Sequence, residues 1–110
     1  DASDQLAPYQ RTAEFERLQA FLAAPDDAGA PAPPPRAGDA AQRFADAFAF
    51  GVACHQRRSP SAFLAHLDRL RRSGDRLDAL ALVGLCHGLF HDQPRADHIA
   101  AAWASLTEIL

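Results

Sequence analysis

The stretch LDALALVGLCHGLFH, residues 77–91, decides how we expect the rest of the chain to fold. Residues 79–86 within it form a run of eight without a polar side chain. By periodicity alone, such a run fits a buried strand or a buried helix. The flanks and the composition favour a helix, because Gly74-Asp75 precedes the run, Pro94 follows it, and leucine and alanine dominate. We therefore expect a helix that is buried on most of its circumference, with the other helices packed around it.

Helices are expected on both sides of this stretch, because apolar residues recur there at intervals of three and four. Their ends carry local signals. Asp39 and Gln42 form a capping box, and Ser59 before Pro60 is typical of a first turn. Gly74 can adopt the left-handed conformation that is common in the residue after a helix. The predicted helices are 9–24, 39–56, 60–73, the stretch 77–91, and 94 almost to the end of the chain.

The predicted fold class is all-α, a small stack or bundle of four to five helices arranged as helical hairpins. Connections of a few residues make consecutive helices antiparallel neighbours. The 110 residues are enough for one domain with a core. We divide the chain into an N-terminal segment with an amphipathic helix (1–24), a linker rich in proline and alanine (25–38) and a helical domain (39–110).

The linker contains AGAPAPPPRAG (28–38), in which proline and glycine interrupt every regular element. Segments of this kind are semi-rigid, extended spacers. A ligand for a proline-recognition domain is the alternative interpretation, although PPPR alone is an incomplete motif. The first helix therefore either docks back on the helical domain or reaches out to a partner.

Composition narrows the class of protein. Hydrophobic residues make up 48% of the chain, as in globular proteins, and no apolar run approaches the ~20 residues of a membrane span. All 11 basic residues are arginine, and alanine and proline are abundant, which indicates a GC-rich bacterial genome. The start does not resemble a signal peptide and the chain has no methionine, so we expect a cytoplasmic protein with a processed or trimmed N-terminus. The net charge of −3 argues against a dedicated nucleic-acid binder.

The chain contains an internal repeat. A shift of 32 residues aligns DAFAFGVACH (46–55) with DALALVGLCH (78–87), and two Cys-His pairs fall in register. Each unit reads as one helix, a short turn and a second helix. Self-similarity over 20 to 50 residues is typical of stacked supersecondary units, none of which buries its apolar face alone.

The second unit, LVGLCHGLFHDQPRADHIAAAW (82–103), resembles a tetratricopeptide repeat. Gly84 stands where that family packs a small residue in its first helix. Ala96 stands where a small residue lets the second helix approach closely. His87 departs from the pattern, because the family prefers an aromatic residue there. Over about 78–110, the resemblance implies a stack of helical hairpins whose concave face binds a peptide or a helix, as in small chaperones of bacterial secretion systems.

Cysteine and histidine side chains are the strongest candidates for chemistry. Cys54 and Cys86 are expected to be buried free thiols, with a disulfide, a metal ligand or a catalytic thiol as alternatives. If a metal is bound, its ligands would be Cys54, His87 and His91, because histidines four residues apart project from one face of a helix. The CxxC and HExxH signatures are missing, so we interpret the histidines as helix C-terminal residues that interact well with the helix dipole. No cofactor is expected.

Six of the 11 arginines lie between Arg57 and Arg76. Arg69, Arg72 and Arg76 recur at helical spacing and would share one face. This cluster would contact an acidic protein partner, nucleic acid or only solvent. Nucleic acid is disfavoured, because no aromatic residues interleave with the arginines.

Gly84 and Gly88 form a ridge of small residues on the central helix. Each glycine costs up to ~1 kcal/mol relative to alanine in a helix, so a packing reason is expected. The ridge would receive either a phenylalanine from the second helix or the helix of a partner. Trp103 is interpreted as a core residue, with an anchor in a binding groove as the alternative.

Together these observations predict a non-enzymatic protein–protein interaction module, like a chaperone or adaptor, that binds a helix or an extended segment of a partner. Catalysis is not expected, because no side chain that would orient a thiol–imidazole pair is identifiable. The alternatives are a helical regulator that contacts nucleic acid through Arg57–Arg76 and a metal-binding helical domain. No membrane contact is expected, and the sequence is compatible with either a monomer or an oligomer. The predicted partner-binding residues are Arg69, Arg72, Arg76, His87, His91 and Trp103.

Overall fold

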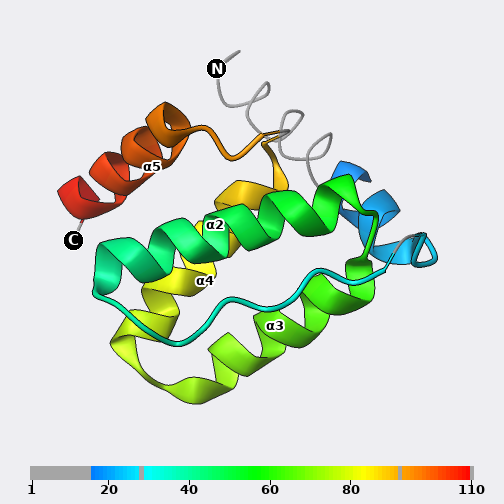
Figure 1. Cartoon of the computed structure of the whole chain (residues 1–110), viewed down its shortest axis with the longest axis horizontal. Helices are drawn as coiled ribbons and strands as arrows, with labels where there is room; N and C mark the ends of the chain where they lie inside the picture. Colours follow the sequence, from blue (N-terminus) through cyan, green and yellow to red (C-terminus); the bar gives the residue numbers. More distant parts are fainter. Residues whose placement is uncertain (1–15, 28, 92, 110) are drawn as a thin grey trace, which may run out of the picture.

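The computed structural model describes residues 16–27, 29–91 and 93–109, and this part of the chain contains helices and no strands (Figure 1). The all-α prediction is confirmed. Residues 16–23 are helical, and the part of the first predicted helix before residue 16 lies outside the described residues. The remaining helices are α2 (Ala40–Gln56), α3 (Pro60–Ser73), α4 (Arg76–Leu89) and α5 (Ala96–Ile109).

The helix boundaries follow the local signals closely. Asp39 Oδ1 accepts a hydrogen bond from the backbone N–H of Gln42 (2.9 Å), so half of the predicted capping box forms at α2. Pro60 is the first residue of α3, and Gly74 follows α3 in the left-handed conformation, with φ of 71°. Asp75 caps α4 by accepting a hydrogen bond from its second backbone N–H (2.9 Å).

The most extensive packing in the fold joins α2 and α4, which run parallel and are not consecutive in the chain (Figure 1). A Cβ atom added at Gly84 would lie 2.5 Å from the carbonyl oxygen of Phe44, and one added at Gly88 would lie 2.1 Å from that of Phe48. Glycine therefore lets the two backbones touch. The ridge of small residues receives the second predicted helix, which decides between the two alternatives above.

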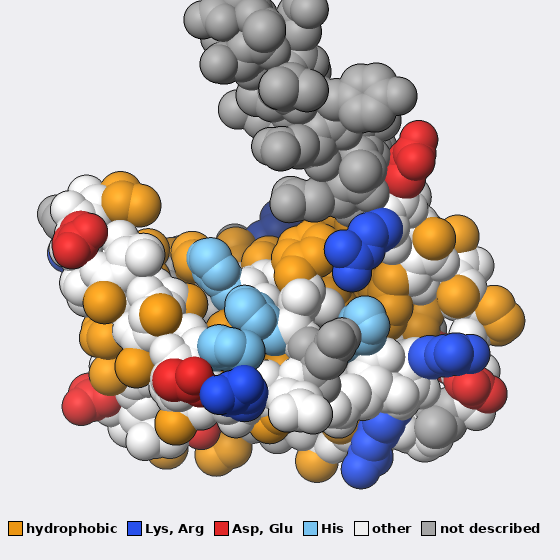
Figure 2. All heavy atoms as spheres, turned by 90° about the horizontal axis from the view of Figure 1, so that it is seen from above, with side chains coloured by type: hydrophobic (Ala, Val, Ile, Leu, Met, Phe, Trp, Pro, Cys, Tyr) orange, Lys and Arg blue, Asp and Glu red, His pale blue; other side chains and the backbone are white. Residues whose placement is uncertain are grey.

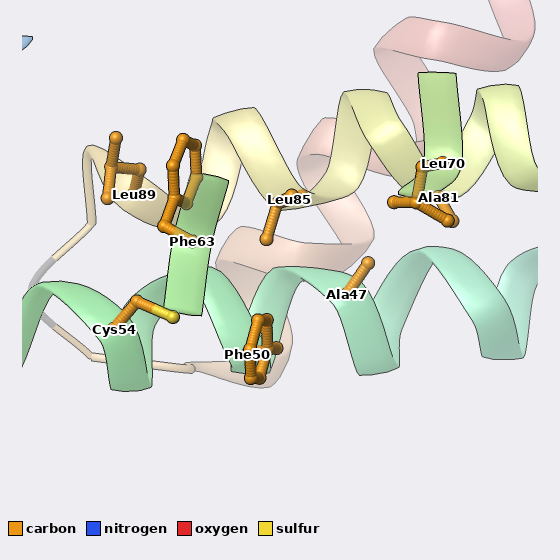
Figure 3. Packing of buried hydrophobic residues seen from close by; sticks show 8 residues of the cluster. All are labelled: Ala47, Phe50, Cys54, Phe63, Leu70, Ala81, Leu85 and Leu89. Carbon is orange, nitrogen blue, oxygen red and sulfur yellow. The ribbon is translucent and has the colours of Figure 1, made fainter. Parts of the chain in front are cut away.

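The larger apolar cluster lies between α2, α3 and α4 (Figure 3). Residues on one face of α2 meet residues on the facing side of α4, and α3 adds two more. The members are Ala47, Phe50, Cys54, Phe63, Leu70, Ala81, Leu85 and Leu89. Leu18, Phe21 and Leu22 pack against the same cluster. The first helix therefore docks back on the helical domain.

The smaller cluster is formed by Phe44, Phe48 and Val52 on the side of α2 that faces α5. Trp103 and Leu106 are among the α5 residues that pack against it, but no residue of α5 is itself buried. Thus α5 is less deeply buried than α2, α3 and α4. None of the described helices is long and apolar enough to cross a membrane.

Candidate functional site

The segment of residues 29–38, which we call the strap, lies beside the helical domain, and we call the hollows that it forms with α2, α3 and α4 the groove. It runs in the direction opposite to α2 and lies between α2 and α3 in Figure 1. A hollow of about 260 Å³ lies between its prolines and one face of α2. The residues that line this hollow are Pro31, Ala32, Pro34, Pro35, Asp46, Ala49, Phe50 and Ala53. The expected spacer is therefore seated on the helices.

The groove ends at Asp78, a carboxylate whose residue is only 2% exposed. Oδ1 of Asp78 accepts a hydrogen bond from Arg43 Nη1 (3.1 Å). Oδ2 accepts hydrogen bonds from Arg36 Nη2 (2.6 Å) and from Ser73 Oγ (2.5 Å). Because a buried charge is costly unless it is paired and hydrogen-bonded, these three donors explain how the acid is tolerated.

Local sequence explains why these groups meet. Because α2 and α4 are parallel, their first turns lie side by side, and this brings Arg43 next to Asp78. Gly38 has φ of 91°, which permits the turn from the strap into α2 and leaves Arg36 beside the same acid. Asp75, the cap of α4, lies 3.9 Å from both guanidinium groups. The N-terminus of a helix favours such acidic residues.

His66 of α3 lies under the strap and is 5% exposed. Its ring meets Phe50 edge-on, with 4.9 Å between the ring centroids. His66 Nδ1 and Arg43 Nε are buried, and neither has a hydrogen-bond partner within the described part of the chain. Burial lowers the pKa of His66 below its ordinary value, and Arg69 lowers it further, while Asp78 acts in the opposite direction.

Acidification is expected to destabilise the chain through His66. As the pH falls through the ordinary histidine value, the unfolded chain binds a proton first, so the free energy of unfolding decreases; above that value His66 contributes nothing. The measurement is the urea midpoint at about pH 7 and pH 5. His66→Phe should show a smaller drop than the unaltered chain, and exposed His87→Gln should keep the full drop. Equal drops in the unaltered chain and His66→Phe would contradict the assignment.

Both cysteines are free thiols, so the disulfide alternative is wrong; Cys54 is buried as predicted, but Cys86 is only half-buried. Burial raises the pKa of Cys54 to about 11, and it also raises the pKa of Cys86. At neutral pH neither thiol is prepared to act as a thiolate nucleophile or metal ligand.

The structure does not bring the alternative metal ligands together. Cys54 belongs to the larger cluster, whereas His87 and His91 lie against the phenylalanines of the smaller one. His91 is not part of α4, because the helix ends at Leu89, but both histidines lie against phenylalanines on the same side of α2. In the ranges that the structure describes, no three histidine, cysteine or acidic residues are grouped so that they could hold a metal.

The predicted arginine face is divided between two helices. Arg69 and Arg72 are exposed on α3, and Arg76 is the first residue of α4, because Gly74 ends α3 between them. Arg72 also pairs with Asp68 one turn earlier (3.1 Å). The three arginines therefore do not form one continuous helical face.

The aromatic half of the predicted partner-binding set lies on the α5 side. Trp103 packs against Phe44 with 5.2 Å between ring centroids, but it is only half-buried, so it lies at the edge of the smaller cluster rather than within the core. His87 is exposed, and its ring lies 6.4 Å from that of Phe44. His91 lies 5.1 Å from Phe48. Figure 2 shows several histidine side chains gathered on one face.

A separate apolar pocket of about 220 Å³ lies between residues 16–23, α3 and the end of α4. Leu64 and Phe90 at this pocket are 41% and 44% exposed. The complete lining is Leu18, Leu22, Phe63, Leu64, Leu67, Cys86, Leu89 and Phe90.

Comparison of the chain with protein-family models, with curated proteins and with solved structures gives no match.

The sequence analysis did not predict the network of Asp78 with Arg36, Arg43 and Ser73. One signal was available: Asp78 shares a helical face with Ala81 and Leu85, so an acid stands in an apolar stripe. A charge in that position requires a partner, but its spacing does not identify Arg36 or Arg43.

Proposed function

We propose that this chain is a non-enzymatic protein–protein interaction module, like a chaperone or adaptor, that binds an extended segment of a partner protein in the groove of the strap. The observation that carries the proposal is the strap itself. An extended, proline-rich segment already lies along α2, and its Arg36 reaches the buried Asp78.

The chemistry of the groove suits an extended ligand. Proline-rich segments are pre-formed in an extended conformation, so they lose little freedom on binding. The face of α2 beneath the prolines includes Ala49 and Ala53, whose small side chains leave room for the rings. The order of four consecutive helices joined by short connections is compatible with the tetratricopeptide-like arrangement that the sequence resembles, although the most extensive packing joins α2 with α4. A bacterial cytoplasmic adaptor would fit this reading.

The arginines give less support to nucleic acid as the partner. Arg58 lies 3.9 Å from Asp27, and Arg57 donates to the carbonyl oxygen of Gly29 (3.5 Å). Arg72 is paired with Asp68. Part of the cluster is thus engaged within the chain, which leaves fewer guanidinium groups for phosphates.

A peptide in trans tests the proposal. We expect a labelled peptide with the sequence of residues 31–38, PAPPPRAG, to bind the full-length Arg36→Ala chain saturably in fluorescence anisotropy. It should bind the unaltered chain at least about tenfold more weakly, because the tethered strap competes at high effective concentration.

The control variant is Arg71→Ala, because Arg71 is exposed on α3 and should leave the groove unchanged. It should bind as weakly as the unaltered chain. A labelled single-stranded oligonucleotide at low and high salt tests the alternative, since phosphate contacts weaken steeply with salt. Saturable, salt-sensitive oligonucleotide binding without peptide binding would overturn the proposal.

A further inference from the structure

The two carboxylate oxygens of Asp78 differ in where their hydrogen-bond donors lie, because one arginine is largely buried on a helix and the other is exposed on the strap. Oδ1 is held by Arg43, which belongs to the folded helix α2 and has a side chain only 16% exposed. Oδ2 is shared by Ser73 and Arg36. The Arg36 side chain is 59% exposed and belongs to the strap rather than to a helix. One guanidinium is thus part of the core, and the other lies at the surface.

Removal of Arg36 would leave the acid tolerable but incompletely paired. Asp78 would keep Arg43 and Ser73, so the buried charge would still have donors. Oδ2 would then have a free position towards the groove. An ionised carboxylate only accepts hydrogen bonds, so a donor must fill that position.

The charges around this position favour a cation. Without Arg36, the carboxylates of Asp75 and Asp78 would face one guanidinium, that of Arg43. Asp46 lines the same hollow and adds a third carboxylate. A planar guanidinium matches a carboxylate better than a compact ammonium group does, because it presents several N–H donors in a fixed plane.

We infer that Asp78 is an arginine-reading position, and that Arg36 occupies it until an arginine-bearing extended segment of a partner replaces it. This inference rests on the proposed function and adds to it the chemistry of the partner and the role of the strap. The strap is then an internal competitor that the partner must displace. The prolines of the strap define the rest of the ligand: an extended stretch of proline and small residues before the arginine.

The affinities of three peptides for the Arg36→Ala chain test this preference for arginine: PAPPPRAG, PAPPPKAG and PAPPPQAG. The arginine peptide should bind at least about tenfold more tightly than the glutamine peptide, with the lysine peptide between them. In Arg36→Ala combined with Asp78→Asn, the advantage of arginine over glutamine should disappear. Circular dichroism establishes that this double variant is folded at the temperature of the titration, and Asp68→Asn in the Arg36→Ala background is the matched control that keeps the advantage.

The outcomes separate this inference from the proposed function. Equal binding of the arginine and glutamine peptides would overturn the arginine-reading position and leave peptide binding standing. Binding of none of the peptides would overturn both. If the double variant does not fold, the order arginine, lysine, glutamine in the single variant decides, because a general preference for cations would make lysine and arginine equal.

Discussion

Replacing Gly88 by alanine should lower the free energy of unfolding by about 3 kcal/mol, at the upper end of what overpacking costs. The new Cβ atom would lie 2.1 Å from the carbonyl oxygen of Phe48 and 3.0 Å from its Cα. Both are backbone atoms, so no side-chain rotation relieves the clash, and α2 must move away from α4. This separation opens both apolar clusters. It outweighs the gain of about 1 kcal/mol in helix propensity.

Urea denaturation followed by circular dichroism measures this effect. Gly29→Ala is the matched control, because no atom lies within 4 Å of the added Cβ there. That variant should change stability by less than about 1 kcal/mol. A Gly88→Ala protein as stable as the unaltered chain would contradict the direct backbone contact between the two helices.

Asp78→Asn should lower the free energy of unfolding by about 3 kcal/mol, which is typical when one partner of a buried ion pair is removed. The change removes the charge but keeps the shape, and it leaves the largely buried guanidinium of Arg43 with only the more distant carboxylate of Asp75, at 3.9 Å. Arg36→Ala should cost far less, about 1 kcal/mol or below, because that side chain is 59% exposed. A large cost for Asp78→Asn beside a small cost for Arg36→Ala would show that the buried pair with Arg43, rather than the exposed pair with Arg36, stabilises the fold.

The same denaturation experiment needs two further variants. Asp68→Asn removes an exposed ion pair with Arg72 and should cost less than about 1 kcal/mol. Combining Asp78→Asn with Arg43→Gln should cost less than the sum of the single changes, because no unpaired charge remains. Additive costs, or equal costs for Asp78→Asn and Asp68→Asn, would show that Asp78 is not the centre of the ion-pair network.

Local signals were sufficient to predict the helices. Asp39, Pro60 and Gly74 each act on the turn in which they stand, so the observed helix boundaries lie close to the predicted ones. Glycine in a helix carries a cost that only packing explains, and this predicted the close approach at Gly84 and Gly88. Such features are readable because cause and effect lie within a few residues.

The groove was not predictable in the same way. Arg36 and Asp78 are 42 residues apart, and the parallel arrangement of α2 and α4 must be known before their meeting follows. Proline-rich composition indicates an extended segment but contains no information on what that segment rests against. The division of Arg69 from Arg76 likewise depends on where Gly74 turns the chain. Long-range packing, rather than periodicity, decides these features.

The parallel pairing of α2 with α4 also limits when the fold can form during synthesis. Phe48 and Gly88 touch although 40 residues separate them, so α2 emerges from the ribosome with its partner still unmade. Until α3 has reversed the chain and α4 has followed, Phe44 and Phe48 lack the glycines that cover them. The nascent chain therefore presents an aromatic, aggregation-prone surface until α4 has emerged, and the packing of α2 must await that helix.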